Sequence, residues 1–150
     1  MADLPQLNDH LGYRLRQVSN HVSHRFAQKM ADSGVTVAEW VTLRLLHGAA
    51  PITSGALALR MGMTRGAITK LVDRLHVKQL VDRAADAEDA RIRILSLTAQ
   101  GRALLPRLAA LAEENEAECF GHLWEEERAL FAMLLDRMVD RLDLSDIAVE

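Results

Sequence analysis

The residues best suited to chemistry are basic, and they gather in the middle of the chain. Between Arg60 and Arg93, eight lysines and arginines stand against five acids, a net +3 in a chain whose formal net charge is -3. From position 113 to 150, twelve acids stand against three arginines, a net -9. Such segregation suits a protein that meets a polyanion with one face. The alternative is a chance arrangement of solvated helix surfaces.

A predicted helix between Thr64 and Leu75 would carry several of these cations. Its buried side is marked by four aliphatic residues at helical spacing: Ile68, Leu71, Val72 and Leu75. The opposite side begins with small residues and continues with cations. A helix that enters the major groove needs such a face, because its first turn must approach the base edges closely. We therefore predict DNA contacts from Thr64, Arg65, Gly66, Thr69, Lys70 and Arg74.

Two further elements would position this helix. Pro51 cannot lie inside a helix, and a short helix capped by Thr53 or Ser54 should follow it and end at Gly62. Together the two helices form a helix-turn-helix. After them, residues 80–84 and 92–97 read as two strands joined by a polar tip. This ribbon would be a wing beside the recognition helix, and the DNA contacts that we predict on it are Asp89, Arg91 and Arg93.

In order along the chain, these residues resemble the winged-helix signature of the multiple-antibiotic-resistance regulator (MarR) family of bacterial transcription factors. The matching positions are Leu57-Ala58, Gly62, Thr64, Ile68-Thr69, Val72-Asp73-Arg74-Leu75, Leu80-Val81, Arg83, Asp86, Asp89-Ala90-Arg91, Leu97-Thr98 and Gly101. The family usually has glycine where this chain has Gln79. Since a left-handed non-glycine residue costs about 1 kcal/mol, we expect mild strain there or a different helix end.

The resemblance implies a ligand-responsive transcriptional regulator, usually a repressor, that binds an inverted-repeat operator as a homodimer. It assigns the DNA contact of the wing to Asp89-x-Arg91. It also implies that the two copies join through their N- and C-terminal helices.

The segments that flank the winged helix predict long amphipathic helices. Apolar residues recur at three- or four-residue spacing from Leu4 to Met30, and helices are expected from Thr98 to Phe120 and from Glu125 to about Leu142. A further helix from Thr36 to His47 should turn four residues inward: Val37, Trp40, Val41 and Leu45. The terminal helices, with Ile147 behind them, carry more apolar surface than one winged-helix module covers, which is typical of an interface.

We therefore expect residues 1–150 to form a single MarR-type domain that is mainly α with a small β-wing. The winged helix-turn-helix should span about 36–97, and the long N- and C-terminal dimerisation helices about 4–32 and 98–147.

An effector site is predicted on the first helix. His10 and Arg14 stand one turn apart, Tyr13 is adjacent, and Trp40 lies on the next helix. A carboxylate would satisfy the guanidinium, and an aromatic ring could lie against Tyr13 or Trp40. His10-Leu-x-x-Arg14-Leu also resembles the first helix of family members that sense small aromatic acids. The alternative is that Arg14 forms a salt bridge across the dimer with an acid of the C-terminal helices.

Other chemistry has weak support. His21 with His24, and Cys119 with His122, have ligand spacing, but a zinc site needs three or four ligands, so we expect no metal and no other cofactor. The catalytic motifs of hydrolases and phosphate-binding loops are absent from the sequence, so we expect no enzyme. Without a signal peptide or a membrane-spanning run, a cytoplasmic protein is expected. The remaining alternative is a winged-helix module that binds proteins and lacks salt-dependent affinity for DNA.

Overall fold

The computed structural model describes residues 4–48 and 51–144. The helices are η1 (Leu7–Asp9, a 3-10 helix), α1 (Leu11–Asp32), α2 (Val37–Leu46), α3 (Ser54–Arg60), α4 (Arg65–Val77), α5 (Ala99–Phe120) and α6 (Glu125–Arg141). The strands are β1 (Ile52–Thr53), β2 (Val81–Ala85) and β3 (Arg93–Leu97). The predicted fold class, mainly α with a small β-wing, is confirmed.

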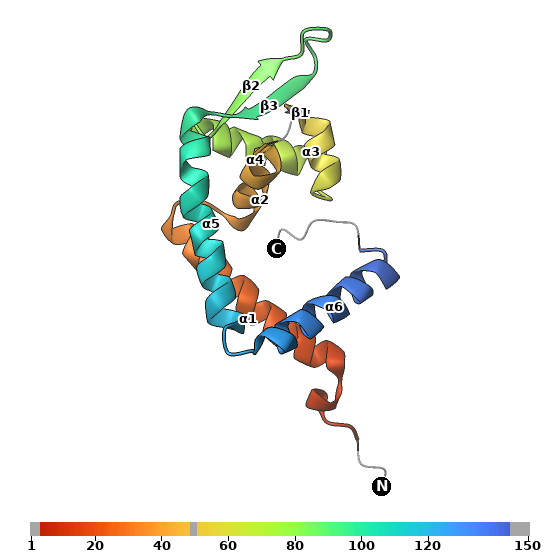
Figure 1. Ribbon diagram of the computed structural model, residues 1–150. Coiled ribbons are helices and arrows are strands. Elements are labelled where there is room, and N and C mark those ends of the chain that lie inside the picture. The colour runs from red at the N-terminus through yellow and green to blue at the C-terminus, as the bar shows by residue number, and fades with distance from the viewer. Residues whose placement is uncertain (1–3, 49–50, 145–150) are drawn as a thin grey trace.

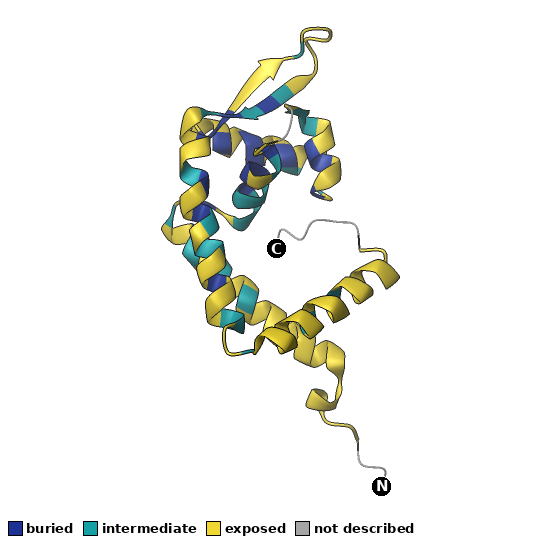
Figure 2. Cartoon of the chain, viewed as in Figure 1, coloured by how far each residue is buried: buried dark blue, intermediate teal, exposed yellow. Residues whose placement is uncertain are grey.

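The chain divides into two regions that we call the head and the frame. The head comprises α2 to β3, and the frame comprises α1, α5 and α6. Figure 1 shows the head at one end of the long helix α5, with α1 beside the far half of α5 and α6 turning away from it. Figure 2 shows that burial is concentrated in the head and that α6 is mostly exposed.

The helix-turn-helix of the head forms as its sequence predicts. Thr53 and Thr64 cap α3 and α4, since their hydroxyls accept the N–H groups of Ala56 and Ala67. The turn between these helices passes through Gly62 at a φ of 59°, where glycine avoids the steric cost of a side chain. The predicted buried stripe of α4 is buried in full: Ile68, Leu71, Val72 and Leu75. These caps and this stripe fix the outward face of α4.

The sheet has one strand that the sequence analysis missed. Within the described residues it is three-stranded and antiparallel in the order β1-β3-β2. Ile52 pairs with Leu95, and Val81 pairs with Leu97. The two residues of β1 are too few to show strand alternation, and their pairing with β3 is a long-range contact. As a result the base of the wing is attached to the start of α3.

The end of α4 shows how the chain accommodates Gln79. This residue is left-handed, with a φ of 58°, and Leu80 N–H donates to the Leu75 carbonyl at 3.0 Å. That bond is the six-to-one bond of a glycine-type helix end, here built with glutamine. The helix therefore ends with the left-handed geometry that the family usually builds with glycine. The sequence predicted either mild strain at Gln79 or a different helix end, and the positive φ of Gln79 fits the first.

Two expectations about helices need correction. The first predicted helix is interrupted, because His10 is extended (φ -93°, ψ 119°) between η1 and α1. On α2, the predicted inward residues are only half-buried, and the fully inward face is Glu39, Thr42, Leu43 and Leu46. That face includes a charged residue, which periodicity of apolar residues cannot detect. Residues 145–147, the end of the predicted dimerisation segment 98–147, lie outside the described residues, so that end of the segment stays a prediction.

Ion pairs join the two antiparallel frame helices α1 and α5. Lys29 Nζ lies 2.7 Å from Glu114 and 2.9 Å from Glu118, and Arg25 lies 2.8 Å from Glu118. Hydrogen bonds from Lys29 and then Arg25 lower the pKa of Glu118 from 4.5 to about 2. The hydrogen bonds that Lys29 donates to Glu114 and Glu118 raise the pKa of Lys29. These pairs lie at the edge of the contact between α1 and α5, along the half of α5 that lies away from the wing.

Candidate nucleic-acid interface

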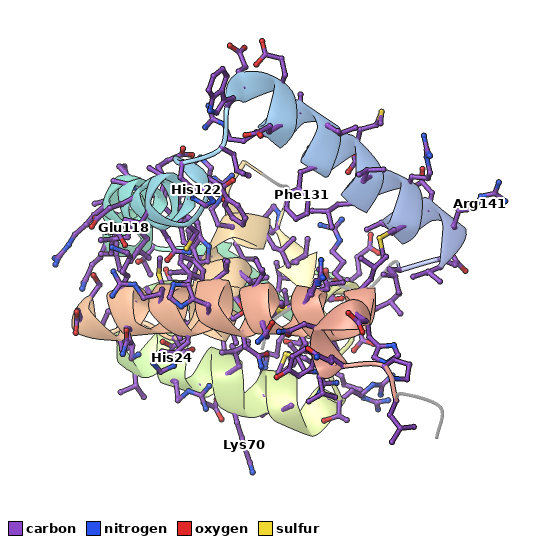
Figure 3. The ribbon with its side chains drawn as sticks, turned by 90° about the horizontal axis from the view of Figure 1, so that it is seen from below. His24, Lys70, Glu118, His122, Phe131 and Arg141 are labelled. Carbon is purple, nitrogen blue, oxygen red and sulfur yellow. The ribbon has the colours of Figure 1, made fainter. Side chains whose placement is uncertain are left out.

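The residues predicted to contact DNA lie on α4 and on the wing, where Lys70, Arg74 and Arg91 are exposed. At the start of α4, an atom added at the Cβ position of Gly66 would meet nothing within 4 Å, so a partner can approach the backbone there. Lys70 extends from α4 away from the rest of the molecule (Figure 3). The helix thus presents a small, accessible first turn followed by a cation, as a reader of the major groove requires.

The tip of the wing is organised by two aspartates. One carboxylate oxygen of Asp86 accepts the backbone N–H groups of Glu88 and Asp89, at 2.8 and 3.1 Å. Asp89 accepts the backbone N–H of Arg91 at 2.9 Å. Asp89 therefore shapes the backbone that carries Arg91, and among the described residues it forms no side-chain ion pair with the Arg91 guanidinium.

Three predicted arginines surround a hollow between α4, the wing and the start of α3. This hollow, of about 420 Å³, is lined by Arg65, Arg91 and Arg93 together with Thr69 and residues 53–55. Guanidinium groups and hydroxyls match the acceptor oxygens of a phosphate. Residues 53–55 were not among the predicted contacts. The pairing of β1 with β3 brings them there, and a local sequence pattern carries no sign of that pairing.

Two contacts fasten the wing to α4. Arg83 on β2 forms an ion pair with Asp73 on α4, and His76 Nδ1 lies 3.1 Å from the Val81 carbonyl oxygen. The wing and α4 are therefore held as one unit. A third cation of α4, Arg74, leans back toward α2, where its Nε lies 3.5 Å from Glu39 Oε1. Of the predicted contacts on α4, Arg74 is thus the one already engaged with the body of the protein.

The predicted effector residues do not gather within one chain. His10 precedes α1, Tyr13 is partly exposed on its first turn, and Arg14 Nε donates to the Asn8 carbonyl. Trp40 is half-buried against the core that contains Met30, with the Arg44 guanidinium 5.6 Å from its ring. Met30 lies sixteen positions after Arg14 along α1, which is roughly 24 Å at 1.5 Å per residue. Trp40 is therefore at the opposite end of α1 from the other three.

A wide apolar groove opens on the same face of α1 as Arg14. It has a volume of about 820 Å³ and lies between α1, the end of α5 and α6. Gln17 and His21 line it, and they follow Arg14 by three and seven residues, which places all three on one helical face. Across the groove are His122 and Phe131, which point into the space between α5, α6 and α1 in Figure 3.

Metal sites and membrane spans are both missing from the part of the chain that the structure describes. Three or more His, Cys, Asp or Glu side chains do not gather anywhere in that part as the ligands of a metal ion would. In 4–48 and 51–144, a helix both long and apolar enough to span a membrane does not occur.

The sequence of the head and the geometry of the whole chain are both shared with known proteins. The model of the MarR family matches residues 33–92, which cover most of the head. The crystal structure of a probable transcriptional regulator from Pseudomonas aeruginosa is 30% identical, with a TM-score of 0.77 over 89% of this chain and 99% of that one. The chain belongs to the MarR family.

Two further proteins are similar to this chain over most of its length. The HTH-type transcriptional repressor NicR of Pseudomonas putida is 28% identical over 89% of this chain and 85% of its own. Bordetella bronchiseptica BpsR, whose DNA binding is regulated by 6-hydroxynicotinic acid, is 25% identical. Its structure superposes with a TM-score of 0.78 over 92% of this chain and 99% of its own. The family resemblance inferred from the winged-helix residues is confirmed, and it extends over the frame helices.

Proposed function

We propose that this MarR-family protein is a transcriptional repressor that binds an inverted-repeat operator as a homodimer. The observation that carries the proposal is the exposed basic face formed by α4 and the wing. The apolar side chains beneath this face are buried in the core of the head. Two relatives support the same function, since NicR is a repressor and BpsR binds DNA. A regulator of this kind has no catalytic role, in keeping with the family.

On this proposal each copy contacts DNA in two ways. Lys70, Gly66 and Thr69 meet base edges in the major groove, and Arg65, Arg91 and Arg93 receive backbone phosphate in the hollow. Base contacts carry sequence preference, whereas phosphate contacts fix the position of the protein on the duplex. Two heads related by two-fold symmetry would select half-sites about 10 bp apart.

The homodimer is proposed from the apolar surface of the frame. Leu11 is 80% exposed and Leu134 is 42% exposed, and the exposed apolar side chains of the frame continue along both terminal helices. They are Leu15, Val18, Leu130, Met133, Met138 and Val139, with Leu7 just before α1 and Leu142 just after α6. Apolar stripes of this length are covered by a partner in soluble proteins. A two-fold pairing of frames would place the two heads side by side.

A salt titration of duplex binding tests the proposal. Operator sequences are first selected from a random DNA pool, and the affinity of the full chain is then measured between about 50 and about 300 mM salt. A steep fall of affinity with salt and an inverted repeat in the selected sites are expected. A chain that binds no duplex at any salt concentration would instead be a winged-helix module for protein partners.

We further propose that a small aromatic acid releases the DNA. Such an acid, 6-hydroxynicotinic acid, regulates DNA binding by the relative BpsR. In this chain His10, Tyr13 and Arg14 offer an imidazole, a ring and a cation near the start of α1, and Arg14 shares a helical face with Gln17 and His21, which line the apolar groove. The acid's ring would enter the groove and its carboxylate would meet Arg14. Trp40 takes part only if the two-fold partner supplies it, because one chain does not bring it near Arg14. DNA would be released because the acid binds more tightly to a dimer whose two recognition helices no longer have the spacing of the half-sites.

Calorimetry with a panel of hydroxybenzoates, hydroxycinnamates and hydroxynicotinates tests this part. Binding to the parent and at least tenfold weaker binding to Arg14→Ala are expected, with Arg16→Ala as the matched control on the same helix. If Arg14→Ala keeps its affinity for the acid but dimerises more weakly, Arg14 forms the dimer salt bridge instead.

A further inference from the structure

Glu39 is a charged side chain in the centre of the head. It is the third residue of α2 and is completely buried, with 0% of its side chain exposed. Its Oε2 accepts the backbone N–H of Thr36 at 2.9 Å, which makes it half of the capping box that begins α2. A capping box needs no burial, and capping alone does not explain why a carboxylate lies beneath the recognition helix.

The second partner of Glu39 comes from the end of the recognition helix. Lys78, the residue that follows α4, donates to Glu39 Oε2 at 2.7 Å and to the backbone carbonyl of Gly34 at 2.8 Å. Gly34 forms the left-handed corner that ends α1, with a φ of 74°. One ammonium group therefore joins the end of α1, the start of α2 and the end of α4.

The other oxygen of Glu39 is less well satisfied. Within the described residues, Oε1 has no hydrogen-bond partner, and Arg74 Nε approaches it at 3.5 Å. That distance is longer than a charge-assisted hydrogen bond of about 2.7–2.9 Å. Of the two cations near Glu39, Lys78 therefore makes the closer contact, and Arg74 remains 54% exposed and available to DNA.

We propose that Glu39 and Lys78 form a clamp that transmits the tilt of α1 to the recognition helix and so sets the half-site spacing that the dimer accepts. The inference rests on the proposed function, because spacing has meaning only for a dimer bound to DNA. Glu39 and Lys78 are positioning residues, since neither must touch the duplex. Burying the Glu39 carboxylate costs solvation energy, which its contact with Lys78, 36% exposed at the edge of the head, offsets in part. Because the same ammonium also binds the Gly34 carbonyl, the pair ties α4 to the end of α1.

Without the clamp, α4 keeps its apolar stripe against the core but loses its polar attachment to the α1 corner. Each head then still reads one half-site, while the angle between head and frame is less restricted. Losing the clamp should therefore change the affinity for a single half-site little. It should change the relative affinities for operators of different half-site spacing much more.

The test uses the full chain and three duplexes: the selected operator, the same operator with one base pair added between half-sites, and one with one base pair removed. The parent should prefer the selected spacing, and Lys78→Met should lose about tenfold of that preference while binding a single half-site as before. Arg44→Met, an exposed cation of α2 outside the clamp, is the matched control and should behave as the parent.

Lys78→Met leaves Glu39 buried without its main partner, so this variant risks unfolding. The double variant Glu39→Gln, Lys78→Met removes both charges and keeps similar volumes, which restores stability without restoring the clamp. Loss of spacing preference in the folded double variant is the expected result. A double variant as strict as the parent overturns the clamp, and so does a parent that tolerates all three spacings. A parent that binds no duplex overturns the proposed function itself, and this inference with it.

Discussion

The head and the frame differ in where their apolar side chains find partners. The buried apolar core runs from Met30 to Leu108, and it lies in the head and in those ends of α1 and α5 that touch it. Of the described residues of α6, none is buried, and in α1 Met30 alone is. Both regions are helical and amphipathic, so helix formation does not separate them. The difference is that the apolar side chains of the head are buried within one chain, whereas those of α6 and of most of α1 remain exposed on its surface.

This difference assigns a task to each region. Because the core of the head is buried within one chain, the polar and basic side chains on its surface are not needed for folding and can contact DNA. The open stripes of the frame make its geometry depend on association, and therefore on anything that binds between the copies. A regulator needs both properties, a rigid reader and a support whose arrangement can change.

The largest effect is expected from a cavity in the head. Leu57 on α3 is completely buried, whereas Leu59, two residues away, is 82% exposed. Leu57→Ala should lower the free energy of unfolding by about 2–5 kcal/mol, and Leu59→Ala should change it by no more than about 0.5 kcal/mol. Denaturant unfolding at one fixed protein concentration measures both. Equal losses in the two variants would mean that the core of the head is not where the structure places it.

The second expected effect is in the frame and acts on association. Leu134 borders the apolar groove and is 42% exposed in the single chain. Leu134→Asp should weaken the dimer by roughly 2 kcal/mol, about 30-fold in Kd, because a symmetric interface contains each substitution twice. Sedimentation equilibrium measures the change, and Ala132→Asp adds the same charge on another face of α6. A Leu134→Asp dimer as tight as the parent's would exclude this face from the interface.

A smaller effect is expected at the wing, where one phosphate contact is at stake. Arg91→Ala should weaken binding to all duplexes and make the slope of log affinity against log salt shallower by about one. Folding and dimerisation should not change, because Arg91 is exposed at the tip of the ribbon. Arg107→Ala removes an exposed arginine of α5 and serves as the control. If Arg91→Ala binds as tightly as the parent, the wing does not contact DNA.

The smallest effect concerns the ion pairs of the frame. The pKa of Glu118 is about 2 in the folded chain, below its ordinary 4.5, because Lys29 and Arg25 donate hydrogen bonds to it. A lowered folded pKa gives stability that is present above pH 4.5 and is lost as the pH falls toward 2. Glu118→Gln should therefore be slightly less stable than the parent above pH 4.5, equal to it near pH 2, and flatter in its pH dependence between the two. Glu116→Gln is the control, and an unchanged pH profile in Glu118→Gln would contradict the pairing.

Much of the head could be predicted from the sequence, because its signals are local. The caps Thr53, Thr64 and Thr98 accept N–H groups three residues ahead, and Gly62 permits its own backbone angle. The apolar stripe of α4 repeats with the period of the helix and so fixes which side faces outward. These patterns determined the fold class, the family and the exposed face of the recognition helix without any long-range information.

What only the tertiary structure decided depends on contacts between distant parts of the chain. Glu39 reads as a surface residue until Lys78, thirty-nine residues later, supplies its partner. Strand β1 is two residues of extended chain until β3 pairs with it. Trp40 and Arg14 look like neighbours on successive helices, yet the length of α1 separates them. In each case the local sequence pattern does not predict the contact. A buried charge, a short strand or a binding site is stabilised by residues that are distant in the sequence and come together only on folding.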